Sequence, residues 1–563
     1  GAIIETNVGP VAHDHGSGGV RITANDITIS GGPKILAILG TNPATIPFVG
    51  IRSNVEPEST AASSGDVLLN ATTIRIKDFG QIETRTASTG HAGHITLKAS
   101  GDIALDFAIV ESGSKTSSGH AGNITFSSSQ GDVKTTSSFI TSQSNDSGNA
   151  GNINLDAPHG DILLDGTQVL NRAEGTGTLG GIQITANNLH LNQSTIAGNN
   201  FTKQVAGNIA ITLDGHLNLA GGSLINTVAF GSANAADLII RARDIQITGE
   251  KSSLETSTIS SGHAGRLSLF TDNLQLTDGG KLSSGSFVGV KKEIPSGHGG
   301  VISIQGFRSP GTSVAIDGLG SGIFTTAEGT GDGGTINLSA RSLTMTNGAT
   351  ITASSTNTGL SPGNAGDISI NAGQSLEMRD SSITTQATKA SGGNIKIQAV
   401  DRIRLVNSVV SSSVADGPGG GGNILIDPQV VALQDSKILA QAADGQGGAI
   451  KIITSLFLRD ANSKVNADAG SSGLNGTVTI QSPTSNLSES LGTLPSNPSQ
   501  AHSLLTQRCA ALVSNGQASS FVVAGREQLP SDPGSWLSSP LALVSLGEGL
   551  DACLLYTSPR PRD

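Results

Sequence analysis

Cysteine is nearly absent from this chain. Only Cys509 and Cys553 occur among 563 residues, and both lie close to the C-terminal end. No disulfide framework can therefore hold the preceding residues together, and this sparing use of cysteine is consistent with an exported protein.

Aromatic and charged residues are also scarce. They make up 3% and 14% of the chain, which is poor material for the core and active site of a globular enzyme. Lysine and arginine are scattered, and the formal net charge is −11, so no basic stripe for nucleic acid is present. No apolar run approaches 18 residues, which excludes a helix long enough to span a bilayer.

Glycine, by contrast, is abundant and regularly placed. The chain has 75 glycines, about twice the usual share. A small-residue turn followed by an alternating strand occupies 119–126, 90–97 and 148–155, and it returns about every 29 residues. The glycines of this repeat turn include Gly93, Gly122, Gly151, Gly265, Gly300, Gly366, Gly393 and Gly422. A fixed period of this length is the signature of a repeat architecture.

Each repeat carries three short apolar pulses with strand periodicity. In one unit these are Ile395 with Ile397, Ile403 with Leu405, and then Val409. The pattern predicts an all-β fold, a parallel β-helix (β-solenoid) of about 16 three-sided coils of about 29 residues. One coil cannot bury its inward side chains, so stability must come from stacking on its neighbours.

The repeats divide the chain into segments. We expect an irregular first coil with an inserted loop at 1–63, the β-helix at 64–480, a Ser/Pro/Asn linker at 481–500 and a different tail at 501–550. The last stretch, 551–563, is basic and resembles read-through of a sequencing adapter, so we expect it to be non-native or disordered.

Histidine recurs in the repeat turns, at His91, His120, His263 and His298. A ladder of metal ligands is one interpretation. Asn149 and Asn364 occupy the same slot, however, and histidine and asparagine share a tolerance for left-handed backbone. We therefore predict a structural turn and no metal.

The motif Gly297-His298-Gly299 matches a short motif of β-helical polygalacturonases, as does Arg75-Ile76-Lys77. Those enzymes also need paired carboxylates as acid and base. This chain has neither Asp-Asp nor Asn-Thr-Asp, and its two motifs occur in the reverse order. We expect no enzymatic activity, no catalytic residue and no cofactor.

The repeat unit Gly-x-Ala-Gly-Asn-Ile-x-Leu and the tail resemble filamentous-haemagglutinin-type large exoproteins, especially members labelled as S-layer family. The tail residues that carry the resemblance are Cys509, Phe521, Gly525, Arg526, Leu529 and Pro530. The resemblance implies a right-handed parallel β-helix, export through an outer-membrane barrel transporter (two-partner secretion), and adhesion at the bacterial cell surface.

The secretion domain of that family carries Asn-Pro-Asn motifs near the N-terminus. None occurs here, since Asn42-Pro43-Ala44 is not one. We expect this domain to be missing from the sequence. The predicted function is that of a secreted or surface-bound adhesin whose partners are glycans or the surface of a host or neighbouring cell. Two alternatives stay open: a self-assembling surface-layer component, and a polysaccharide lyase or hydrolase.

Overall fold

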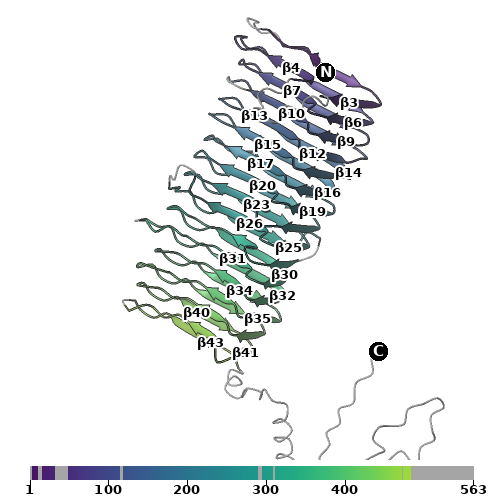
Figure 1. Ribbon diagram of the computed structural model, residues 1–563. Helices are drawn as coiled ribbons and strands as arrows, with labels where there is room; N and C mark the ends of the chain where they lie inside the picture. Colours follow the sequence, from purple (N-terminus) through teal and green to yellow (C-terminus); the bar gives the residue numbers. More distant parts are fainter. Residues whose placement is uncertain are drawn as a thin grey trace, which may run out of the picture. The chain divides into compact units, whose positions relative to one another are not determined.

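The computed structural model of the protein describes residues 3–483, except 10–15, 32–47, 115–117, 290–293, 309–310, 360 and 472. Within these residues there are 43 β-strands, and the strands pair in parallel (Figure 1). They form a solenoid of about 15 turns with a spacing of about 29 residues. The prediction of an all-β parallel β-helix is confirmed. No helix in the described part is long and apolar enough to cross a membrane.

Each coil contains a first, a second and a third strand. The first strands are β2 (Val20–Thr23), β5 (Val67–Ala71), β8 (Ile95–Ala99), β11 (Ile124–Ser128), β18 (Ile209–Leu213), β21 (Leu238–Arg241), β24 (Arg266–Phe270), β27 (Val301–Gln305), β34 (Ile395–Ala399), β37 (Ile424–Asp427), β40 (Ala449–Ile453) and β43 (Thr477–Gln481).

The second strands follow a short bend. They are β3 (Asp26–Ser30), β6 (Thr73–Lys77), β9 (Ile103–Asp106), β12 (Val133–Thr136), β19 (His216–Ala220), β22 (Asp244–Thr248), β25 (Asn273–Thr277), β28 (Thr312–Asp317), β35 (Arg402–Val406), β38 (Val430–Gln434) and β41 (Leu456–Arg459). In four coils the first and second strands are continuous, as β14 (Ile153–Asp165), β16 (Ile182–Asn192), β30 (Thr335–Thr346) and β32 (Ile368–Arg379). These long strands join both ladders into one 27-stranded sheet.

The third strands form a separate 16-stranded sheet. They are β1 (Ile3–Glu5), β4 (Gly50–Val55), β7 (Gln81–Thr86), β10 (Ile109–Ser114), β13 (Phe139–Ser144), β15 (Gln168–Ala173), β17 (Thr195–Asn200), β20 (Leu224–Ala229), β23 (Ser253–Thr258), β26 (Lys281–Ser286), β29 (Gly322–Phe324), β31 (Thr350–Thr352), β33 (Ser382–Thr384), β36 (Val409–Ser411), β39 (Lys437–Leu439) and β42 (Lys464–Asn466).

Neighbouring coils stack in register, so that equivalent residues of successive repeats form columns. Ile95 pairs with Ile124, and Ile124 pairs with Ile153. All three side chains are fully buried. Outward residues alternate with them, such as Thr96 and Thr125, because successive side chains of a strand point to opposite faces.

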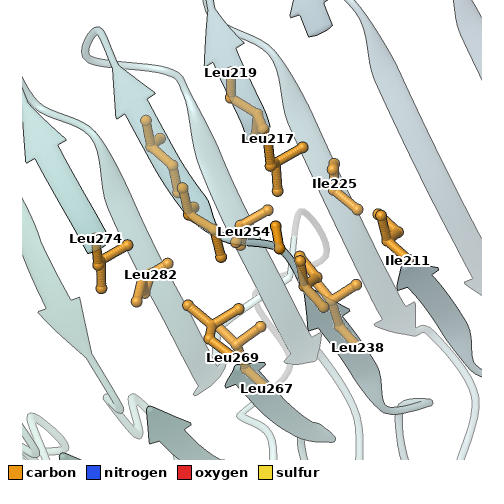
Figure 2. Close-up of a cluster of buried hydrophobic side chains, with 14 of the residues drawn as sticks. Ile211, Leu217, Leu219, Ile225, Leu238, Leu254, Leu267, Leu269, Leu274 and Leu282 are labelled. Atoms are coloured by element: carbon orange, nitrogen blue, oxygen red, sulfur yellow. The ribbon is translucent and has the colours of Figure 1, made fainter. Parts of the chain in front are cut away.

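One continuous apolar core runs through the stack. Figure 2 shows a section of it, in which Leu267 and Leu269 of one first strand point inward together with Leu238 of the coil before. Burial of such a side chain stabilises the fold by about 1.5–3 kcal/mol. Leu254 and Leu282, from the third strands, enter the same core from the opposite sheet.

The described strands make up 15 complete coils. The first complete coil comprises β2, β3 and β4, and the fifteenth comprises β40, β41 and β42. The sixteenth unit contributes only β43 to the described part, so the prediction of about 16 coils agrees with the observed 15 complete coils and one further strand. The loop expected in the first coil falls largely on 32–47, which lies outside the described residues. The tail at 501–550 and the end at 551–563 also lie outside them.

Candidate functional site

The repeat-turn glycines lie at the return corner, between the third strand of one coil and the first strand of the next. A Cβ atom at any of the eight predicted glycines would lie 1.8–2.2 Å from a backbone carbonyl oxygen of the preceding coil. For Gly122 this atom is the oxygen of Gly93, at 2.1 Å. Close stacking of backbones therefore requires glycine here. Ala236 occupies the same place in one coil.

Buried hydroxyl groups in the third strands, or directly after them, form hydrogen bonds with the backbone of this corner. Ser142 donates to the carbonyl oxygen of Gly122 at 3.1 Å and accepts from the N–H of Gly151 at 2.9 Å. Thr84, Ser112, Thr256, Ser284 and Thr385 also donate to the carbonyl of a repeat-turn glycine. These hydroxyls satisfy backbone groups that stacking alone leaves unpaired.

The turn histidines form a hydrogen-bonded column with the next coil. His120 donates its backbone N–H to Nδ1 of His91 at 3.2 Å, and Asn149 donates to Nδ1 of His120 at 2.8 Å. Asn149 in turn accepts from Thr178 N–H through Oδ1, at 2.8 Å. At this position of the turn, the side chain thus accepts a hydrogen bond from a backbone N–H of the following coil.

This geometry corrects the explanation predicted for the slot. None of His91, His120, His263 and His298 has a positive φ, and neither do Asn149 and Asn364. The left-handed residues lie instead at the corner between the second and third strands, at Phe107, Ser137, Gln193, Asn407 and Asp435 among others. The prediction of a structural turn holds, but its cause is a hydrogen bond between coils rather than backbone conformation.

The His91 and His120 rings stack with their centroids 4.5 Å apart and their planes 8° from parallel. Burial lowers the pKa of His120, and the neighbouring charge of His91 lowers it further. A neutral imidazole suits the column, because Nδ1 can accept only when it carries no proton.

The two polygalacturonase-like motifs lie far apart. Arg75 and Lys77 are on β6 in the second coil, whereas His298 precedes β27 in the tenth. Eight coils separate them, or about 38 Å at the usual spacing of strands. His298 Nδ1 accepts from the N–H of Asp332 at 2.9 Å, as in the other columns. No group of three or more potential metal ligands occurs in the described part of the chain.

The predicted tail residues Cys509, Phe521, Gly525, Arg526, Leu529 and Pro530 lie outside the described residues. The structure therefore places only the repeat-turn residues among the predicted sites.

A surface feature that sequence reasoning missed lies on the first-strand face of coils eight to ten. It is a groove of about 650 Å³ lined mainly by β21, β24 and β27 and by the return corners before them. The outward residues of β24 are Arg266, Ser268 and Phe270, and they are in register with those of the two neighbouring strands. We call this hollow the Arg241–Arg266 groove.

The groove combines cationic and apolar side chains. The guanidinium of Arg241 lies 4.4 Å from the centroid of the Phe270 ring. Neither Arg241 nor Arg266 forms an ion pair with a carboxylate in the described part. Asp237 also lines the groove, and its Oδ1 accepts from the backbone N–H of Arg266 at 2.8 Å.

The sequence did contain a signal for this groove. Adjacent coils have small or polar residues at the outward positions, as at Ala210 and Thr212 of β18 and Asn337 of β30. Alignment of the units by their outward positions would have shown that the two arginines differ from the residues of the coils on either side.

No protein family, no curated protein and no solved structure was found to match this chain. Its function is therefore inferred from its sequence, its fold and its surface chemistry.

Proposed function

We propose that the chain is the rod of a secreted or surface-bound exoprotein of filamentous-haemagglutinin type, and that it mediates adhesion through weak, repeated contacts with glycans. The resemblance of the repeat unit and the tail motivates this assignment. It includes export by two-partner secretion and a bacterial surface location.

The observation that carries the proposal is the register of the outward residues. Thr96, Thr125, Asn154 and Gln183 pair in sequence along four successive coils. The same outward position thus recurs about every 4.8 Å along the stack. Hydroxyl and amide side chains fill this column in two runs of four coils, Thr96 to Gln183 and Ser268 to Ser369, and each run suits hydrogen bonding to polyhydroxylated chains.

Repetition compensates for weak individual contacts. When several sites on one rod engage one polymer, every contact after the first is intramolecular, and the overall affinity can rise about 10²–10⁴-fold. A rigid stack favours this gain because its sites need no ordering upon binding.

The test is retention of protein-coated beads on cells or glycan-coated surfaces under flow. We expect beads coated with the folded chain to be retained, and soluble glycan to release them. Beads coated with the heat-unfolded chain are the control. Equal retention of both coatings would contradict the proposal.

The surface-layer alternative differs in its partner, which is a second copy of the chain. Electron microscopy of the purified protein distinguishes the two. Dispersed rods that bind glycan surfaces support adhesion, whereas ordered lattices or filaments without glycan binding would favour the structural role.

A further inference from the structure

We propose that the Arg241–Arg266 groove binds an acidic glycan, an oligosaccharide that carries carboxylate or sulfate groups. This inference rests on the proposed glycan contacts of the rod and specifies where one of them lies and which ligand it selects.

The two arginines provide the charge complementarity. Both side chains are exposed and lack a carboxylate partner in the described part, on a chain whose net charge is −11. A guanidinium presents a planar fork of N–H donors that matches a carboxylate or a sulfate. Stacking of Arg241 on Phe270 holds one of the two forks in place, which lowers the entropy lost when an anion binds.

The spacing of the arginines favours a sparsely charged ligand. Phe270 is the register partner of Arg241, and Arg266 lies four residues before it on the same strand. The two arginine Cα atoms are therefore about 14 Å apart, from the usual strand rise and spacing. Duplex nucleic acid carries a charge about every 1.7 Å and is bound by denser basic surfaces. A short oligosaccharide with separated acidic groups fits better.

The rest of the lining suits the body of a sugar chain. Ile239, Phe270 and Val301 are partly exposed apolar side chains, against which the C–H faces of pyranose rings can pack. Ser268 lies between Arg266 and Phe270 on the same strand and is only 9% exposed. The middle of the groove is therefore deeper than its two ends at the arginines.

Two imidazoles add hydrogen-bond donors at the corner side. His263 Nδ1 accepts from the N–H of His298 at 3.1 Å, and His298 Nδ1 accepts from Asp332. With Nδ1 as the acceptor, the proton of each ring is on Nε2, which is a donor for a hydroxyl or carboxylate oxygen.

A second hollow of about 390 Å³ adjoins the groove on the same face, across β27, β30 and β32. It is lined mostly by polar residues, including Ser303, Asn337, Ser369 and Asn371. This surface can hold the neutral part of a longer chain whose acidic groups lie at the arginines.

The test is isothermal titration of the whole chain with short oligosaccharides at low ionic strength. The ligands are an oligogalacturonate, a heparin-derived oligosaccharide, a neutral malto-oligosaccharide of similar length and a single-stranded DNA oligomer. We expect the two acidic glycans to bind and the neutral glycan to bind at least about tenfold more weakly, as loss of a charge-assisted contact implies. The relative affinities of the first two decide between carboxylate and sulfate.

The decisive variant is Arg241→Glu with Arg266→Glu, for which we expect acidic-glycan affinity to fall by more than about tenfold. The matched control is Lys396→Glu with Lys451→Glu, because both lysines are exposed outward residues of first strands on the same face. It should leave the affinity unchanged. Circular dichroism and thermal unfolding must show that both variants fold like the parent chain.

Three results would overturn the inference: no binding of either acidic glycan, equal loss in both double variants, or tighter binding of DNA than of the acidic glycans. Its failure is separable from that of the proposed function. If beads adhere to cells or neutral glycans while no acidic oligosaccharide binds, the proposed adhesion stands and the proposed ligand of the groove is refuted. If the chain binds acidic glycans but the beads do not adhere, the proposed ligand of the groove stands and the proposed adhesion is refuted.

Discussion

His120 accepts a hydrogen bond at Nδ1 from the backbone N–H of Asn149, which is 2.8 Å away and one coil further along the stack. The contact joins residues 29 positions apart in the sequence. It explains why histidine and asparagine, and also Asp332 in its own column, can share one position. Each offers an acceptor at the same distance from the backbone.

Mild acidification should weaken this column. The pKa of His120 is lowered in the folded chain, so its contribution is fully present above the ordinary histidine value of about 6.5 and is lost as the pH falls from there through the lower folded-state pKa. We expect a small drop in the unfolding midpoint between pH 7.5 and 5.5. His120→Asn keeps the acceptor without the titration, so it should reduce the drop. An unchanged slope in this variant would refute the role assigned to the imidazole.

The return corner should not tolerate a methyl group at Gly122. The new Cβ would lie 2.1 Å from the oxygen of Gly93, so the coils must separate. We expect Gly122→Ala to cost about 1–3 kcal/mol in the free energy of unfolding, measured by denaturant titration. Gly113→Ala in β10 is the control, because its nearest neighbours lie at 3.4 Å. Similar stability of the two variants would show that the corner is looser than described.

A charge in the core should be far more harmful than one on the outer face. Ile397 is fully buried in a first strand, and Thr125 faces outward from another. We expect Ile397→Asp to lower the free energy of unfolding by more than about 3 kcal/mol, and Thr125→Asp by less than about 1 kcal/mol. Chemical unfolding followed by circular dichroism measures both. Comparable losses would exclude the stacked-coil arrangement.

Glu255 should be destabilising in its charged form. Burial raises the pKa of its carboxyl group, against the opposing effect of a hydrogen bond from Ser257. A raised folded-state pKa means that stability is complete below the unfolded value, about 4.3, and is lost as the pH rises through the folded one.

Replacement of Glu255 by glutamine should therefore raise the unfolding midpoint at pH 7 and have little effect near pH 4. Glu377→Gln is the comparison, because Glu377 forms an exposed ion pair with Arg402 and should change stability by less than about 1 kcal/mol at either pH. A lower midpoint for Glu255→Gln at pH 7 would contradict the assigned burial cost.

The fold could be predicted because its determinants repeat. The inward isoleucines and leucines of each first strand, such as Ile124, recur once per coil, and the glycines mark the place where backbones meet. The histidine column was misread because its partner is a backbone N–H one repeat away, which local conformational preference does not reveal. The Arg241–Arg266 groove was missed because it depends on outward residues that depart from the repeat.

The in-register stacking of coils is the central claim, and engineered disulfides test it most directly. Thr96 and Thr125 are register partners, so their Cα atoms lie about 4.8 Å apart, within the range that a disulfide spans. With Cys509 and Cys553 replaced by serine, the Thr96→Cys and Thr125→Cys chain should form an internal disulfide, detected by peptide mapping. Thr96→Cys with Ser127→Cys should not, because those Cα atoms are about 8 Å apart. Efficient cross-linking of the second pair but not the first would contradict the stacked solenoid.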